Sequence, residues 1–216
     1  MAETFTAVQV RAKSIAAMPA PLGELHNALH NQIAWLHLKW KDFRGLYADT
    51  PATIALLNDA APSFFHNLQR MMWEDVLLHL CRLTDRPKSA GKDTLTLLRI
   101  SELIPDANLR QKVNTQAELA RSSTHFARDW RNRRLAHREL PPLHGQTPEP
   151  LADASRRHVE IALESIRETI NLIEHHYLDS PVAYQYSIEA PGGIDALLFR
   201  LRLGVAARQP FEIIDL

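Results

Sequence analysis

Arginines and one histidine crowd residues 128–139 of the sequence, which read RDWRNRRLAHRE. The wider stretch from residue 121 to residue 138 carries six arginines against a single acidic residue, Asp129. Arginine keeps its charge at neutral pH, and its planar fork matches the geometry of phosphate oxygens. The stretch therefore predicts a site for a phosphate-bearing ligand. The alternative is structural, because cations near the C-terminal end of a helix also complement the helix dipole.

His137 adds a group that can move a proton. Neighbouring positive charges disfavour the imidazolium form, so we expect this histidine to be partly neutral at physiological pH. Arg131 and His137 are six residues apart, about 600° of rotation on an ideal helix, and would not share one face. They come together if His137 lies at or past the end of the helix, which Pro141 and Pro142 favour, or if a second subunit completes the site.

The composition limits the compartment and the kind of partner. Lys and Arg total 25, and so do Asp and Glu, so no overall basic field attracts nucleic acid. The only cysteine, Cys81, lies in an apolar helical stretch, which excludes an internal disulfide and favours a reducing compartment. No stretch approaches the roughly 20 apolar residues that span a bilayer. We therefore expect a cytoplasmic protein with no membrane partner.

The elements that must hold these residues are helices. Apolar side chains recur at spacings of three and four in the segments 22–47, 64–83 and 159–177, which is the spacing of a buried helical face. Pro62 is expected to split the segment 51–85 into a short and a longer helix. A further helix that starts after Asp106 is expected to run into the arginine-rich stretch. The sequence predicts an all-α fold, an antiparallel bundle of four to five main helices.

We expect the bundle to form one domain over residues 1–178, long enough to bury its own core. Residues 179–216 would follow as a short C-terminal appendage. Within it, the run IDALLFRLRLGVAAR favours a short helix.

The stretch RNRRLAH, residues 131–137, resembles the signature of the HEPN superfamily, in which an arginine, a polar residue directly after it and a few variable positions precede a histidine. The stretch FFHNLQRMMWEDVLLHLCRLTDRP, residues 64–87, is followed by a loop and by the helix that ends in RNRRLAHRE. This order resembles, more narrowly, the abortive-infection, AbiU-type branch. The resemblance covers roughly residues 20–178.

Similar proteins are metal-independent endoribonucleases in which two protomers pair, so that both motifs line one cleft. The resemblance implies that Arg131 stabilises the developing charge on the scissile phosphate. It implies that His137 moves the proton of the ribose 2′-OH, and that Asn132 orients the substrate or His137. RNA brings its own nucleophile, so a proton acceptor and an electrostatic clamp suffice, with no cofactor. The expected partners are RNA, a second copy of the chain and an antitoxin protein, as for a phage-defence or toxin effector.

Further charged residues are expected around that centre. Flanking phosphates of the RNA would be held, without reading its sequence, by Arg128, Arg133, Arg134 and Arg138. Four residues of the preceding long helix are candidates for contacts that position the motif, with a surface or salt-bridge role as the simpler interpretation: Glu74, Asp75, Arg82 and Asp85. Trp35 and Trp73 lie off the apolar stripes and are candidates for a dimer contact, where aromatic residues are enriched.

Two other classes of function stay open. The chain could be a non-catalytic HEPN module that binds a nucleotide, an RNA or an antitoxin, or a purely structural helical protein. A metal site is the competing chemistry, since one long helix carries His26, His30 and His37 and another carries His79. His26 and His30 have the i, i+4 spacing of metal ligands. No carboxylate joins them in an E-x-x-H arrangement, however, and His26 falls inside the apolar stripe, so we expect no metal.

Overall fold

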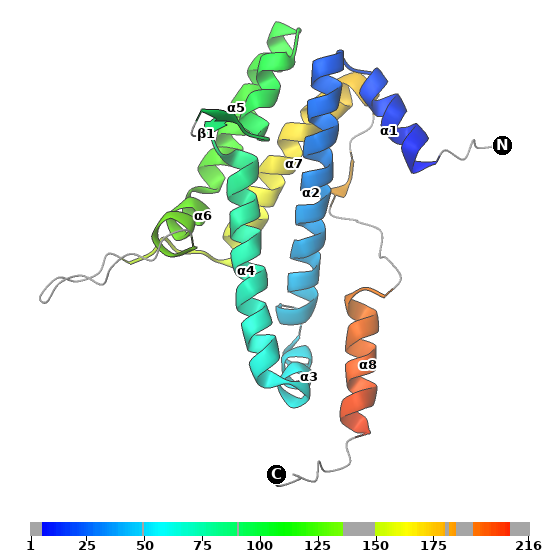
Figure 1. Ribbon diagram of the computed structural model, residues 1–216, viewed down its shortest axis with the longest axis vertical. Coiled ribbons are helices and arrows are strands. Elements are labelled where there is room, and N and C mark those ends of the chain that lie inside the picture. Colours follow the sequence, from blue (N-terminus) through cyan, green and yellow to red (C-terminus); the bar gives the residue numbers. More distant parts are fainter. Residues whose placement is uncertain are drawn as a thin grey trace, which may run out of the picture. The chain divides into compact units, whose positions relative to one another are not determined.

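Helices make up most of the computed structural model, so the predicted all-α fold class is confirmed (Figure 1). The structure describes residues 6–48, 50–89, 91–135, 150–179, 182–184 and 192–207. The α-helices are α1 (Ala7–Ala16), α2 (Ala20–Tyr47), α3 (Pro51–Ala60), α4 (Pro62–Thr84), α5 (Ala107–Ser123), α6 (His125–Trp130), α7 (Arg156–Leu178) and α8 (Ile194–Ala206). A 3-10 helix, η1 (Leu97–Leu103), precedes α5, and a π-helical turn, η2 (Arg131–Leu135), follows α6. The short strands β1 (Lys88–Ser89) and β2 (Lys92–Asp93) pair antiparallel.

Local sequence signals set several helix ends. A single residue separates α3 from α4, which begins at Pro62, so the predicted split is confirmed. Proline fits the first turn of a helix and not its interior. At the start of α5, the carboxylate of Asp106 accepts a hydrogen bond of 2.6 Å from the backbone N–H of Leu109, as expected for an N-cap. None of the described helices is long and apolar enough to cross a membrane.

The chain forms two units. The first comprises Met1–His37 and Leu77–Tyr186, and the second comprises Leu38–Val76 and Ser187–Leu216. Helices α2 and α4 therefore contribute residues to both units. The predicted division of the chain at residue 178 stays a prediction.

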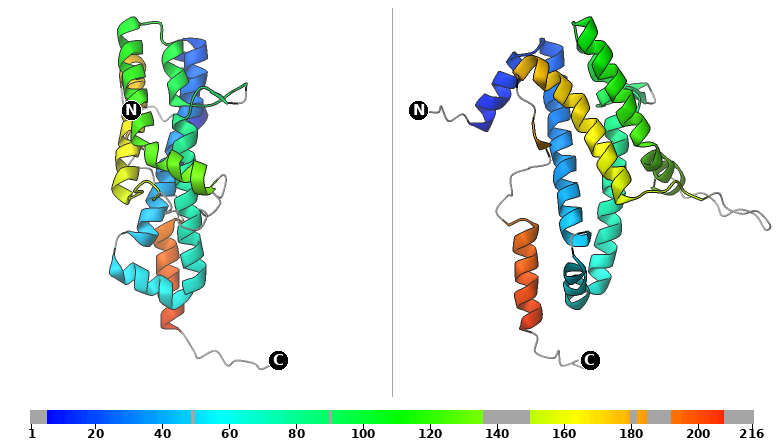
Figure 2. Two further views of the ribbon diagram at one scale, coloured as in Figure 1. Left: turned by 90° about the vertical axis from the view of Figure 1, so that its left-hand side faces the viewer. Right: turned by 180° about the vertical axis from the view of Figure 1, so that it is seen from behind.

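The first unit is built around α5 and α7, which pack side by side, with η1 against both (Figures 1 and 2). The stripe predicted for α7 is at most 1% exposed at Val159, Leu163, Ile166, Ile170 and Ile173. The stripe of α2 is equally buried in this unit at Leu22, Leu29, Ile33 and Leu36. At the start of α2, a Cβ on Gly23 would lie 2.4 Å from the carbonyl oxygen of Ile15, so glycine permits the close approach of α1.

The second unit has its own core. Leu46, Leu57, Phe65 and Leu198 form one buried cluster, so α8 packs with α2, α3 and α4. The short helix predicted in the C-terminal tail is therefore present. Trp40 is buried and stacks on Phe43 at 5.3 Å between ring centroids, and Trp73 lies 5.5 Å from Phe43. Trp73 thus packs inside this unit, whereas Trp35 is 52% exposed.

Candidate functional site

The arginine-rich stretch does not lie on one continuous helix. Helix α5 ends at Ser123, Thr124 interrupts the helical ladder, and α6 starts at His125. Figure 1 shows α6 turned away from the line of α5. The hydroxyl of Thr124 lies 2.9 Å from the carbonyl oxygen of Arg121, a local bond that competes with helix continuation. The continuous helix expected from Asp106 into the motif is therefore wrong, and the motif itself begins in the π-helical turn η2.

Arg128 ties this break to the end of α4. Its Nη1 donates to the hydroxyls of Thr84 at 3.1 Å and Thr124 at 2.9 Å, and its Nη2 donates to the carbonyl of Arg121. The two hydroxyls lie 2.8 Å apart, and both threonines are at most 1% exposed. Burial lowers the pKa of the Arg128 guanidinium from its usual value. Arg128 was expected to bind phosphate, but its two terminal nitrogens are occupied by protein oxygens.

Arg131, Asn132 and Asp85 come together at the end of α4. Arg131 Nη1 donates to Asp85 Oδ2, and Arg131 Nε donates to Asn132 Oδ1 at 3.1 Å. The Arg131 side chain remains 26% exposed and that of Asp85 31% exposed, so the pair is open to solvent. Two acceptors thus orient the guanidinium while part of the Arg131 side chain stays accessible. Fixed charges of this kind stabilise negative charge that develops on a bound group.

Residues directly before the motif and within it hold the chain where it returns towards α7. Asp129 Oδ2 accepts from the backbone N–H of Ala152 at 2.8 Å, and the indole N–H of Trp130 donates to the Ala152 carbonyl at 2.9 Å. Arg133 donates to the carbonyl of Pro150 at 3.1 Å and lies 3.6 Å from Asp129. The Arg134 guanidinium sits 5.2 Å from the centroid of the Trp130 ring, in cation–π geometry.

A family model described as AbiU2, of the HEPN type, matches residues 20–190. The chain belongs to the AbiU2 family of HEPN domains. The resemblance seen in the sequence is thereby confirmed, and the match extends past residue 178 into the predicted appendage. No curated protein and no solved structure matches the chain.

Two of the predicted site residues of this AbiU2 domain, His137 and Arg138, lie outside the described residues, as do Pro141 and Pro142. The expected meeting of Arg131 with His137 therefore stays a prediction. The chain is described again from Pro150, the residue whose carbonyl Arg133 contacts.

Four residues on α4 and at its end are candidates to position the motif. Among them, Asp85 contacts the described part of the motif. Asp75 pairs instead with Lys39, at 2.6 Å, in the second unit of the AbiU2 domain. Glu74 belongs to that second unit as well and is partly exposed. Arg82 is exposed on α4 in the first unit. The salt-bridge role therefore applies to Asp75 and Asp85, with different partners.

Cys81 lies on α4, four residues before Asp85. It is 0% exposed, as expected for a small buried apolar residue. Burial raises the pKa of the Cys81 thiol to about 11, so the group stays protonated at neutral pH. Cys81 therefore offers the AbiU2 domain packing volume and not a nucleophile.

Two of the four histidines considered as metal ligands, His26 and His30, lie against a buried carboxylate, Glu174 of α7, which is 0% exposed. Glu174 Oε1 lies 3.3 Å from His26 Nε2 and 3.5 Å from His30 Nδ1, and it accepts from the Tyr184 hydroxyl at 2.9 Å. Its Oε2 accepts from the backbone N–H of Val182 at 2.7 Å. In the described part of the chain, no group of three or more His, Cys, Asp or Glu residues could hold a metal ion.

Burial alone would raise the pKa of Glu174, but the neighbouring His26 and His30 rings and the hydrogen bonds from the Val182 N–H and the Tyr184 hydroxyl outweigh it and lower that pKa to about 2. The cluster therefore holds a carboxylate that stays charged. Glu174 is not among the residues expected from the sequence, although it stands four residues after the buried Ile170 and so falls on the apolar face of α7. The contact between Thr84 and Thr124 spans 40 residues and gives no local signal.

Proposed function

We propose that this AbiU2 domain is a metal-independent endoribonuclease of the HEPN type that acts as a homodimer in phage defence or as a toxin. The observation that carries the proposal is the orientation of Arg131 by Asp85 and Asn132 at the solvent-exposed end of α4. An arginine that is held by two acceptors and remains accessible is suited to a phosphate on which charge develops.

RNA supplies the nucleophile in this mechanism. His137 accepts the proton of a ribose 2′-OH, the 2′-oxygen attacks the adjacent phosphorus, and the bond to the 5′-oxygen of the next nucleotide breaks. A proton passes to the leaving 5′-oxygen, so the products are a 2′,3′-cyclic phosphate and a 5′-hydroxyl. Arg131 stabilises the charge on the non-bridging phosphate oxygens, and Asn132 keeps the guanidinium in position.

The other arginines divide into two groups. Arg134 is exposed and lies over Trp130, so it is available to a flanking phosphate, and Arg138 is proposed to act with it. Arg128 and Arg133 contact protein oxygens from the break after α5 and from the return of the chain at Pro150. We infer that these two shape the turn that carries Arg131.

A second candidate function is a non-catalytic module that binds a nucleotide, an RNA or an antitoxin protein. The observation in its favour is that two arginines of the motif pair with acidic residues, since Arg131 contacts Asp85 and Arg133 contacts Asp129. Such pairs lower the net positive charge that a phosphate meets. In this case binding would occur without turnover.

The test is an incubation of the full chain, in the presence of EDTA, with a mixed pool of single-stranded RNA, followed by analysis of the fragment ends. We expect fragments that end in 2′,3′-cyclic phosphate, and we expect the His137→Ala variant to produce none while it keeps its circular-dichroism spectrum. Equal cleavage by His137→Ala would rule out the mechanism. RNA binding with no cleavage by the unaltered chain would favour the second candidate.

A further inference from the structure

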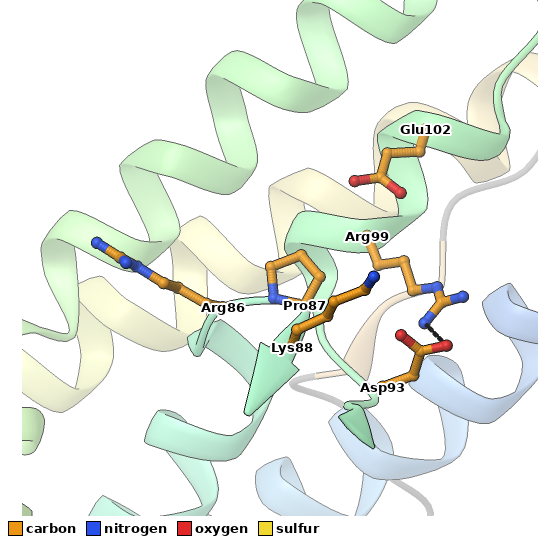
Figure 3. A pocket seen from close by; sticks show the side chains of 6 residues that line it. All are labelled: Arg86, Pro87, Lys88, Asp93, Arg99 and Glu102. Carbon is orange, nitrogen blue, oxygen red and sulfur yellow. Dashed lines mark ion pairs between the residues drawn. The ribbon is translucent and has the colours of Figure 1, made fainter. Parts of the chain in front are cut away.

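A cavity of about 530 Å³ opens beside the end of α4, and nothing in the proposed mechanism uses it. Its lining comes from the loop after α4, from β1 and β2, and from η1: Arg86, Pro87, Lys88, Asp93, Arg99 and Glu102 (Figure 3). Ligand-binding pockets of small molecules have volumes of roughly 300–1,000 Å³. The cavity is therefore large enough for one nucleotide.

The loop that forms one wall is fixed by hydrogen bonds. The Thr94 hydroxyl donates to the carbonyl of Arg86 at 2.7 Å, and the Thr94 N–H donates to the carbonyl of Pro87 at 2.9 Å. The Thr96 hydroxyl lies 2.7 Å from the carbonyl oxygen of Asp85. Arg99 of η1 pairs with Asp93 of β2 at 2.9 Å. The wall is thus formed before any ligand arrives, which lowers the ordering cost of binding.

The cavity adjoins the motif through the backbone. Arg86 follows Asp85 directly, so their Cα atoms are about 3.8 Å apart, and Asp85 holds Arg131. Figure 3 shows the Arg86 side chain pointing away from the other five side chains. The Lys88 side chain extends towards Arg99. Arg86 and Lys88 are both exposed. They therefore offer two exposed cations on one loop, which begins directly after the Asp85 that holds Arg131.

The chemistry of the lining suits a nucleotide better than a bare phosphate. Lysine and arginine bind phosphate oxygens, whereas the carboxylates of Asp93 and Glu102 would repel them. Those carboxylates can accept hydrogen bonds from ribose hydroxyls and from base amino groups. A nucleotide carries both a phosphate for the basic side chains and hydrogen-bond donors for the carboxylates.

We propose that this cavity binds a nucleotide of the RNA strand that flanks the scissile phosphate. Lys88 contacts the phosphate of that nucleotide, and Arg86, on the other side of the loop, contacts a neighbouring phosphate of the same strand. The inference rests on the proposed function in taking RNA as the ligand, but it concerns binding and not cleavage. It adds Arg86 and Lys88 as positioning residues outside the RNRRLAH motif.

The experiment measures RNA binding in the His137→Ala background, where cleavage cannot remove the ligand. Fluorescence anisotropy with a labelled single-stranded RNA, between about 50 and about 200 mM salt, gives the slope of log K against log salt concentration. We expect Arg86→Gln/Lys88→Gln to reduce the magnitude of this slope by about 0.7 for each lost phosphate contact, hence about 1.4. The matched control is Arg70→Gln/Lys112→Gln, which removes one arginine and one lysine from exposed positions on α4 and α5.

An equal change of slope in both double variants, or no change in either, would overturn the inference. Cleavage by the unaltered chain would then still support the proposed function. Conversely, the unaltered chain could fail to cleave RNA while the slope changes only in Arg86→Gln/Lys88→Gln. That result would support nucleotide binding at the cavity and count against the proposed endoribonuclease activity. A free mononucleotide is the second probe, and its tight binding with no effect of the double variant on RNA would also contradict the inference.

Discussion

Arg131 is the residue whose surroundings are most informative for the chemistry. Its guanidinium contacts one charged and one neutral acceptor, Asp85 and Asn132, and both come from the end of α4 or from the motif itself. The cost of reorienting an arginine side chain during a reaction is large, because it has several rotatable bonds. Holding the group in advance removes part of this cost from the transition state.

Replacing Asp85 should therefore impair turnover more than substrate binding. We expect Asp85→Asn to lower kcat by about 10- to 100-fold, because the guanidinium loses its charged acceptor and its fixed position. KM should not rise, since the variant also removes a negative charge near the phosphate. Steady-state cleavage kinetics on a defined RNA would measure both parameters.

The control for this variant is Asp75→Asn. Asp75 stands on the same helix and is also paired with a cation, Lys39, but belongs to the second unit. Its replacement should leave both kinetic parameters unchanged. A loss of activity in Asp85→Asn that came only from a raised KM would assign Asp85 to binding and contradict the positioning role.

At the scale of elements, the motif depends on a break between α5 and α6 that Arg128 stabilises. Its guanidinium joins Thr84 at the end of α4, Thr124 at the break and the last turn of α5. Hydrogen bonds from charged groups contribute about 1.5–3 kcal/mol to stability. We expect Arg128→Ala to lower the free energy of unfolding by this amount, measured by urea denaturation.

The same variant separates a structural role from the phosphate-binding role expected from the sequence. If Arg128 is structural, the salt dependence of RNA binding should not change. Arg70→Ala, at an exposed position of α4, is the control and should affect stability by no more than about 0.5 kcal/mol. Unchanged stability together with weaker RNA binding in Arg128→Ala would restore the original expectation.

The helices that depend on periodic apolar residues could be predicted, and the turns between them could not. The stripes of α2 and α7 and the split at Pro62 follow from spacing and from proline chemistry, which act within one element. The break at Thr124 depends on Thr84, which lies 40 residues earlier. No local pattern contains that contact, so the arginine-rich stretch was expected to continue the helix.

The same limit applies to the candidate site. The motif could be recognised from its residue types and their spacing, and so could the candidate role of Arg131. The choice of Asp85 among four candidate supports could not, because Asp75 and Asp85 are chemically alike and only the fold gives them different partners. The carboxylate beside His26 and His30 could not be predicted for a related reason, since Glu174 comes from α7 whereas both histidines come from α2.

At the scale of the whole molecule, two buried titratable groups should make stability depend on pH. The pKa of Glu174 is about 2 in the folded chain against an ordinary value of 4.5, so its contribution is complete above pH 4.5 and is lost as the pH falls towards 2. Burial lowers the pKa of His37 from 6.5 to about 4. An unfolded chain then binds a proton at His37 more readily, so stability also falls from pH 6.5 to pH 4.

We expect urea denaturation at a series of pH values to show two limbs in the plot of the free energy of unfolding against pH, one from pH 6.5 to pH 4 and one from pH 4.5 to pH 2. Together they should lower the free energy of unfolding by a few kcal/mol. Glu174→Gln should flatten the fall in stability between pH 4.5 and pH 2 and lower stability at pH 7, because the charged acceptor for the Val182 N–H and the Tyr184 hydroxyl is lost. His37→Leu should flatten the limb between pH 6.5 and pH 4. Its stability at pH 7 should be kept, since His37 Nε2 has no hydrogen-bond partner among the described residues. Retention of both limbs in the two variants would assign the pH dependence to other groups.

The proposed catalytic centre needs two protomers, so activity should follow assembly. On dilution, we expect the cleavage rate per protomer to fall with the same midpoint as the fraction of dimer, because a lone motif lacks half of the composite cleft. Light scattering and cleavage assays over one dilution series would give the two midpoints. Full activity per protomer at concentrations where only monomer is present would contradict the composite site.

Trp35 allows the interface to be tested by substitution. It is a large aromatic residue that is 52% exposed, and aromatic residues are enriched at interfaces. Trp35→Ser should move the dimer midpoint and the activity midpoint together to higher protein concentration. Leu119→Ser, at an apolar position that is 54% exposed on α5, is the matched control and should move neither. If Leu119→Ser moved both midpoints and Trp35→Ser moved neither, the interface would lie at α5 and the composite site would stand, because activity would still follow assembly.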